Sequence, residues 1–146
     1  MIKVNKTLKK FGYPKTLVKE YDHWCILLRP EQVTLGSLVF VCKDDVTRFS
    51  NISDEAFNEV PGIIKEIENT LFELFNYVKI NYLMLMMVDP NVHFHVIPRY
   101  AKSKVFKNTV FNDFGWSGAP ELSKYNKISS KLFTDLKEEL KKSFIK

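Results

Sequence analysis

Residues 91–96 constrain the possible fold more than any other part of the chain. Three polar residues, Asn91, His93 and His95, alternate there with three apolar ones. Because successive side chains of a β-strand point to opposite faces, the polar and apolar groups would lie on opposite sides of one strand. Two imidazoles would then stand roughly 7 Å apart along one face. The pattern predicts a strand with reactive side chains on one face and a hydrophobic core behind the other.

The composition indicates a single domain, which we place at residues 1–146. The chain has 146 residues, of which 45% are hydrophobic, enough to bury a core without disulfides or metals. Cys25 and Cys42 lie in apolar, strand-like runs and predict reduced, buried thiols of a cytoplasmic protein. No run approaches the ~20 apolar residues of a membrane span, and the first residues lack the apolar stretch of a secretory signal. We therefore expect no membrane partner.

The net charge permits an anionic partner. It is +5, with a pI of about 9.1, which is compatible with a nucleotide or a nucleic acid. The lysines are spread towards both ends, and acidic residues interleave with those near the C-terminal end, as is typical of a solvated surface. Since no recognised motif favours nucleic acid, we do not expect a nucleic-acid partner.

Periodicity and turn residues predict a mixture of helices and strands. Ser53 is placed to cap a helix, and apolar residues recur at helical spacing over residues 60–75. Pro61 is expected to kink or restart this helix. The first twenty residues are weakly patterned, and no element is assigned to them. The expected elements are strands at 23–29, 36–43, 79–88 and 92–99, the helix after Ser53, and a C-terminal helix opened by Ser129 or Ser130.

The last two strands are expected to form a hairpin around Asp89-Pro90, a natural tight turn. A two-residue turn pairs Met86 with His93 and Met84 with His95, and paired residues share a face. The other face would be wholly apolar and would receive the helix, leaving the histidine face open to a ligand. A one-residue bulge would reverse this assignment. In this register the side chains beside the histidines are Tyr82, Met84 and Met86, and Asn81 faces the helix.

The histidine pair allows several chemical interpretations. The two rings could be ordinary half-buried histidines. They could bind zinc with His23 or Asp89 as a third ligand, although no HxHxDH or HExxH pattern is present. Alternatively, one neutral imidazole could attack a phosphorus while the second stabilises charge on the phosphate or the leaving group. Such a reaction requires no metal in principle.

Residues 91–99, Asn-Val-His-Phe-His-Val-Ile-Pro-Arg, closely resemble the signature of the histidine triad (HIT) family. That signature is His-φ-His-φ-His-φ-φ, where φ is apolar, often followed by Pro-Arg. The similarity covers about residues 20–102, and residues 80–90 look like a bacterial branch labelled diadenosine-tetraphosphate-hydrolase-like. Residues 115–120 resemble that branch's C-terminal tail more weakly. The HIT-like core would thus be about 20–102, followed by a tail and helix at 103–146.

The resemblance implies a fold and an activity. The fold is α+β, with a bent antiparallel sheet, a long helix on one face and a C-terminal helix. The protein would be a homodimer whose sheets join edge to edge. It would hydrolyse or transfer at the α-phosphate of a nucleotide conjugate, either a dinucleoside polyphosphate or a nucleoside phosphoramidate, without a cofactor. His93 would be the nucleophile that carries the nucleotide, and His95 would contact phosphate and assist the leaving group.

The chain departs from the family pattern at the first triad position, which is Asn91. Asparagine donates and accepts hydrogen bonds but cannot titrate. A Gly-Gln-Ser/Thr segment that many members carry before the triad is replaced by residues 88–90. These departures keep open a nucleotide-binding module with little or no turnover. Asn91 itself is assigned to nucleotide or phosphate binding.

Two arginines are further candidates for phosphate binding. Arg29 falls where many members place a ribose-binding asparagine, and it could clamp a phosphate or be a solvated strand end. Arg99 could contact phosphate or pair with a carboxylate or carbonyl at the strand end. Trp116, in a loop with glycine and proline, could cover the active face or anchor the tail.

Overall fold

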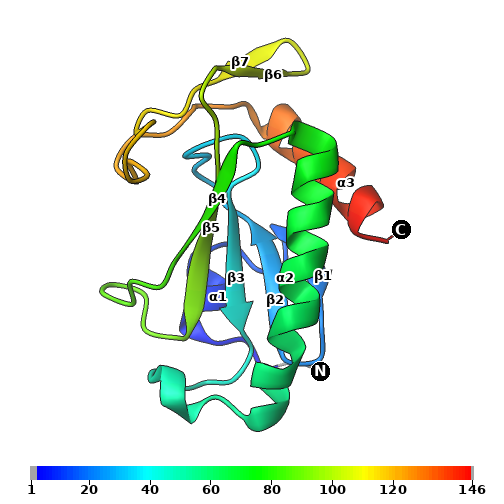
Figure 1. The fold of residues 1–146 in the computed structure, drawn as a ribbon. Coiled ribbons are helices and arrows are strands. Elements are labelled where there is room, and N and C mark those ends of the chain that lie inside the picture. Colours follow the sequence, from blue (N-terminus) through cyan, green and yellow to red (C-terminus); the bar gives the residue numbers. More distant parts are fainter. Residues whose placement is uncertain (1–2, 146) are drawn as a thin grey trace.

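The computed structural model describes residues 3–145, and its centre is one five-stranded antiparallel sheet (Figure 1). The α+β fold expected from the sequence is confirmed, as are the strands expected near residues 23–29, 36–43 and 92–99. Every neighbouring pair in the sheet is antiparallel. In spatial order the strands are β1 (Leu17–Glu20), β2 (Trp24–Leu28), β3 (Leu38–Cys42), β5 (His93–Arg99) and β4 (Lys79–Leu83).

One face of the sheet carries the main hydrophobic core. The apolar stripe of α2 (Asp54–Phe75) packs on it, and α3 (Ser130–Ile145) closes it from the side of β1. Three aromatic rings cross the strands beneath α2: Phe40 stacks on Trp24 with ring centroids 4.2 Å apart, and lies 5.9 Å from Phe94. The residues that the helices add to this core include Ile63, Ile67, Leu71, Leu132, Leu136, Leu140 and Phe144.

The cap residues expected from the sequence begin the two long helices, but the proline inside α2 does not interrupt it. The Ser53 side chain accepts a hydrogen bond from the Ala56 N–H at 3.1 Å, and Ser129 caps α3 in the same way through Leu132. Pro61 was expected to kink or restart α2; the restart does not occur, because the helix is continuous from Asp54 to Phe75. Pro61 lies on the exposed side, where the carbonyl that loses its helical partner can be hydrated.

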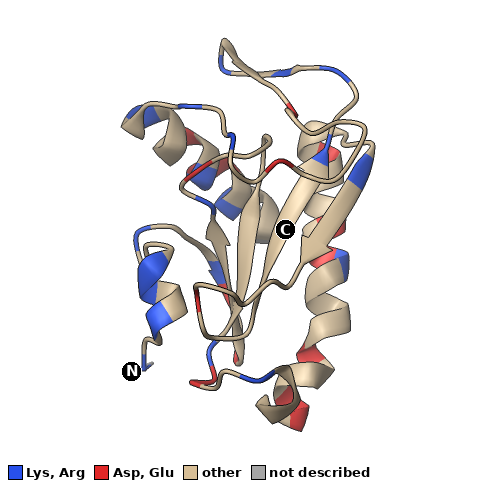
Figure 2. Cartoon of the chain, turned by 90° about the vertical axis from the view of Figure 1, so that its left-hand side faces the viewer, with Lys and Arg blue, Asp and Glu red and all other residues tan. Residues whose placement is uncertain are grey.

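The opposite face of the sheet is covered by the N-terminal segment, which the sequence analysis left without structure. Helix α1 (Lys6–Lys10) lies on this face, and Figure 2 shows it across the sheet from α2. Leu8 and Phe11 pack there in a second, smaller cluster with the inward side chains of β2 and β3. The expectation of an open histidine face is therefore wrong. A five-residue helix shows no periodicity, so its only sequence signal was the cap residue Asn5, which accepts from the Leu8 N–H.

The β4–β5 register differs from the expected one by one residue. Leu83, rather than Met84, pairs with His95, and β4 ends at Leu83. Residues 84–92 form a long connection in place of the two-residue turn, because Met86 has a φ of 50° that an extended strand does not allow. The shift exchanges the two faces. Tyr82 faces α2, donating to the Glu68 carboxylate at 2.7 Å, and Met84 and Met86 pack against the main core.

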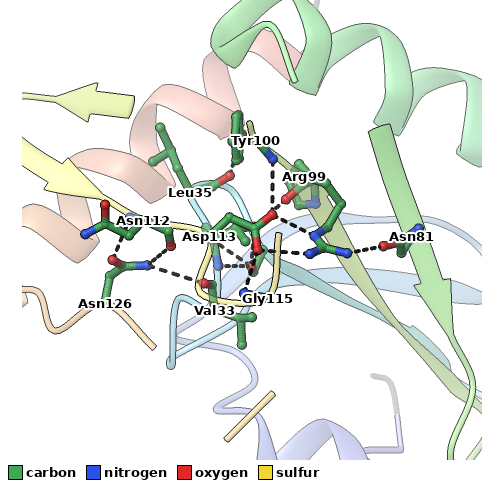
Figure 3. Close-up of polar contacts among 12 residues, drawn as sticks. Val33, Leu35, Asn81, Arg99, Tyr100, Asn112, Asp113, Gly115 and Asn126 are labelled. Atoms are coloured by element: carbon green, nitrogen blue, oxygen red, sulfur yellow. Dashed lines mark hydrogen bonds and ion pairs between the residues drawn. The ribbon is translucent and has the colours of Figure 1, made fainter. Parts of the chain in front are cut away.

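A second, small hairpin follows β5 and was not predicted. It comprises β6 (Lys104–Phe106) and β7 (Thr109–Phe111), joined by Lys107-Asn108 with φ values of 47° and 64°, the signature of a tight hairpin turn. Asn126 anchors the segment that leads on to α3: its amide donates to the carbonyls of Asn112 at 3.0 Å and Val33 at 3.3 Å (Figure 3). It also donates to the Gln32 carbonyl at 3.0 Å. Among the described residues, no helix has the length and apolar character needed to span a membrane.

Two glycines provide a matched test of the packing between α2 and the sheet. Gly36 has a φ of +87°, and a Cβ there would stand 3.0 Å from the Phe75 ring; a Cβ at Gly62, inside α2, would meet nothing within 4 Å. We expect Gly36→Ala to lower the free energy of unfolding by about 1–3 kcal/mol. Gly62→Ala should raise it by about 0.5–1 kcal/mol. Urea denaturation measures both, and a Gly36→Ala protein as stable as the wild type would contradict the packing.

Candidate active site

His93 and His95 lie side by side at the start of β5, opposite Val41 and Val39 of β3. Their ring centroids are 5.1 Å apart and nearly perpendicular, at 82°. Both rings are almost fully covered, with 1% and 6% of each residue exposed. The Phe11 ring lies 5.9 Å from the first and 5.8 Å from the second. The N-terminal segment therefore forms a wall of this site.

The hydrogen bond of His93 fixes which of its nitrogens is reactive. Its Nδ1 lies 2.7 Å from the backbone oxygen of Asn91. A carbonyl oxygen only accepts, so Nδ1 carries the proton and donates. In the neutral ring the lone pair is then on Nε2, away from the strand. This is the arrangement that a nucleophilic imidazole requires.

His95 is held in its neutral form. Burial lowers its pKa to about 4, and the positive charge of Arg29 and the neighbouring His93 add to the effect. Its Nδ1 is buried without a hydrogen-bond partner among the described residues. A buried polar atom of this kind is unfavourable unless something binds it. His95 is therefore suited to hydrogen-bond a ligand rather than to serve as a cation at neutral pH.

Arg29 lies just after β2 and extends the histidine face towards the protein surface. It is 8% exposed, and burial lowers its pKa from the usual value. Its Nη1 donates to the Glu31 backbone oxygen at 2.8 Å, while its Nε has no partner within the described part of the chain. A cavity of about 350 Å³ opens beside it, lined by Lys10, Phe11, Arg29, Pro30 and Glu31. Arg29 Nη1 also lies 3.8 Å from the Glu31 carboxylate, so this cation near His95 is ion-paired on one side and, among the described residues, has a free Nε on the other.

Asn91 has no hydrogen-bonding group left for a ligand. Its side-chain oxygen accepts from the backbone and the hydroxyl of Thr7, and its amide donates to Asp45 and to the Val46 carbonyl. The residue is 2% exposed. The predicted direct contact with nucleotide is therefore not supported, and Asn91 serves the site from within the protein.

Arg99 lies at the far end of β5, on the same face but about 13 Å along the strand from His95. Its Nε and Nη2 donate to the two carboxylate oxygens of Asp113 at 2.7 and 3.0 Å, and its Nη1 donates to Asn81 at 2.8 Å (Figure 3). The carboxylate-pairing alternative is the one observed. Asn81 was missed because the expected register turned it towards the helix. The Trp116 ring lies 6.0 Å from the guanidinium, at this end of the strand.

The zinc interpretation gains no support from the arrangement of ligands. Among residues 3–145, no three His, Cys, Asp or Glu side chains gather in a way that could hold a metal ion. The two cysteines are free and buried, as expected. They point to opposite faces of the sheet, since Cys42 belongs to the main core and Cys25 to the cluster beneath α1.

Comparison with known proteins agrees with this geometry. A model of the HIT domain matches residues 11–102, well over half of the chain, and the protein therefore belongs to the HIT family. No curated protein matches the sequence significantly. Among solved structures, a histidine triad protein from Sinorhizobium meliloti superposes with a TM-score of 0.75 at 14% identity, over 98% of this chain and 97% of that one.

Two further structures show the same likeness. A histidine triad protein from Marinobacter aquaeolei matches with a TM-score of 0.70 and 16% identity, over 99% of this chain and 97% of that one. A HIT family protein from Bacillus anthracis matches at 25% identity with a TM-score of 0.54, over 63% of this chain and 72% of that one. The matches to the Sinorhizobium meliloti and Marinobacter aquaeolei proteins, at 14% and 16% identity, are evidence of the fold alone.

The environment of His95 predicts a specific acid sensitivity. Its pKa of about 4 in the folded state lies below its ordinary 6.5, so the unfolded chain takes up a proton that the folded chain refuses. The free energy of unfolding should therefore fall as pH drops from about 6.5 to 4, by about 3 kcal/mol from this group. In His95→Gln that component should be absent, whereas His23→Gln should keep it. Denaturation at several pH values and NMR titration of the ring measure this. A ring titrating near pH 6.5 would contradict it.

The buried pair of Arg99 and Asp113 predicts a large loss of stability when it is broken. Their side chains are 4% and 1% exposed. Asp113→Ala would leave a buried guanidinium without its partner and should cost about 3–5 kcal/mol. The matched control is Asp135→Ala, whose partner Lys131 is 84% exposed, and which should cost about 0.3–0.5 kcal/mol. Equal losses in chemical denaturation would show that the buried pair does not hold the end of β5.

Proposed function

We propose that this protein is a nucleotide hydrolase or transferase that acts at the α-phosphate of a nucleotide conjugate, with His93 as the nucleophile. The observation that carries the proposal is the bond from His93 Nδ1 to the Asn91 carbonyl, which leaves Nε2 with the lone pair. Membership of the HIT family supports the same class of reaction. The remaining roles follow from the surroundings of the two rings.

The cavity beside Arg29 is where we place the substrate. Phe11 and Pro30 offer apolar walls suited to a base, and Arg29 can donate hydrogen bonds to phosphate oxygens there. His95 does not line this cavity, and its buried Nδ1 would bind a phosphate oxygen deeper in the site. His93 Nε2 attacks the α-phosphorus, and the bond to the leaving group breaks. A polyphosphate leaving group departs as an anion, whereas an amine leaving group takes up a proton from water. Water then cleaves the nucleotidyl-histidine, releasing nucleoside monophosphate and restoring His93. No cofactor takes part in these steps.

The preferred substrates are dinucleoside polyphosphates, with nucleoside phosphoramidates as the second class. This choice rests on the likeness of residues 80–90 to the diadenosine-tetraphosphate-hydrolase-like branch. Arg29, on which a polyphosphate chain could bind, is consistent with it. We place the reaction in the cytoplasm, in keeping with the two free cysteines.

A homodimer joined through β4 is part of the same proposal. β4 is the last strand of the sheet, so its outer edge presents backbone groups without a strand partner among the described residues. The connection that follows exposes apolar side chains, with Met87 86% and Val88 82% exposed. Pairing of two such edges would cover both features.

A nucleotide-binding module with little or no turnover is the second candidate. It is favoured by the burial of both imidazoles beneath Phe11. It is also favoured by the pKa of His95, about 4, because this ring carries almost no proton at neutral pH that it could give to a leaving group. Such a protein would use the same cavity without releasing product.

The decisive experiment is incubation with a panel of dinucleoside polyphosphates and nucleoside phosphoramidates. The wild type should release nucleoside monophosphate, and acid-quenched protein should carry a nucleotide-sized mass adduct. His93→Ala should lose product and adduct together, because no nucleophile remains. His23→Ala, which lies outside the site, should keep both. Thermal stabilisation by nucleotides without product from any member of the panel would instead establish the binding module.

A further inference from the structure

We propose that Thr7 and Asp45, acting through Asn91, are positioning residues for His93, and that Asn91 is required in its place because a histidine could not make these contacts. The inference rests on the proposed function and deepens it. It assigns part of the reactive centre to the N-terminal segment, which the sequence pattern left unassigned.

Thr7 and Asn91 bind each other reciprocally at the start of β5. The Asn91 backbone N–H donates to the Thr7 hydroxyl at 2.9 Å, and this hydroxyl donates onward to the Asn91 side-chain oxygen at 3.2 Å. The Thr7 backbone N–H donates to the same oxygen at 3.2 Å. Thr7 is 0% exposed, so water does not compete for these bonds.

The amide nitrogen of Asn91 holds a second segment. It donates to the Asp45 carboxylate at 3.1 Å and to the Val46 carbonyl at 3.2 Å, both in the loop after β3. Its two acceptor sites and two donor sites are thus all used. The backbone carbonyl of this one immobilised residue is the acceptor for His93 Nδ1. Because that bond selects the tautomer, the surrounding contacts also hold the reactive nitrogen in place.

The helix that carries Thr7 is itself fixed to the sheet. The Asn5 side chain accepts from the Leu8 N–H at 2.9 Å and donates to the Cys42 carbonyl at 2.9 Å. The Cys42 N–H in turn donates to the Val92 carbonyl, next to Asn91. Thr7 therefore lies on a fixed support rather than on a loose chain end.

A histidine cannot replace Asn91 in these contacts. A neutral imidazole has one donor and one acceptor, whereas the asparagine amide here provides two of each. Restoring the third histidine of the family signature would leave Thr7 or the Asp45 loop without partners. Asn91, which departs from the family signature, is therefore the residue that these contacts require.

The test compares Thr7→Val, which keeps the shape but removes the hydroxyl, with Thr7→Ser, which retains it. NMR chemical shifts of the His93 ring nitrogens should show a single Nδ1–H tautomer in the wild type and in Thr7→Ser. In Thr7→Val a mixture of tautomers should appear, and kcat should fall on the order of 10- to 100-fold while KM changes little. Thr7→Val with wild-type nitrogen shifts and kcat would overturn the proposal.

Two variants of Asn91 complete the test. Asn91→Asp keeps the acceptor but loses both donors, and Asn91→His restores the family signature; each should disturb the tautomer and lower kcat. Asn91→His with faster turnover than the wild type would refute the inference. If Thr7→Val does not fold, the test is the comparison of Thr7→Ser with Asn91→Asp. The first should keep the wild-type tautomer and kcat, and the second should not. The tautomer is measured without substrate, so a wild type without turnover would defeat the proposed function while leaving this result intact.

Discussion

The burial of both faces of β5 is the constraint on which the rest of the structure depends. Phe94 and Val96 lie in or against the core beneath α2, and the two histidines lie under Phe11. An imidazole held away from water resists protonation, which is why the pKa of His95 falls to about 4. The same dry surroundings strengthen the hydrogen bond that orients His93. In this site the neutral state of His95 and the hydrogen bond of His93 therefore decide what each ring can do.

Polar networks hold β5 at both of its ends. At the start, Asn91 joins it to α1 and to the loop after β3; at the end, Arg99 joins it to Asp113 and to β4. Burying a charge costs free energy of desolvation, and the attraction within a buried ion pair offsets this cost only when the geometry of the pair is good. The bidentate contact of Arg99 with Asp113 has that geometry, with donor–acceptor distances of 2.7 and 3.0 Å. The histidines are thus set between two fixed points on one strand.

The sequence predicted what depends on neighbours along the chain. The alternation of residues 91–96, the Ser53 cap and the apolar stripe of α2 are local patterns, and all are present in the structure. What it could not predict depends on contacts between distant residues or on single dihedral angles. Met86, with a φ of 50°, cannot extend β4 as a strand, and the one-residue shift in the pairing of β4 with β5 exchanges the two faces. Thr7 meets Asn91 across 84 positions of sequence, and no periodicity marks such a pair.

The positive charge next to the histidines comes from Arg29, and its fixed position would help to stabilise a negatively charged transition state. His95 is neutral, and the positive charge of Arg29 is one of the causes that lower its pKa. The Nε of Arg29 is buried and has no partner among residues 3–145, so a phosphate oxygen could bind there without first displacing a protein group. Groups that are already oriented cost no reorganisation when charge develops, so they stabilise the transition state more than flexible surface lysines can. Fixed orientation, rather than net charge, is then what distinguishes this face from the rest of a basic protein.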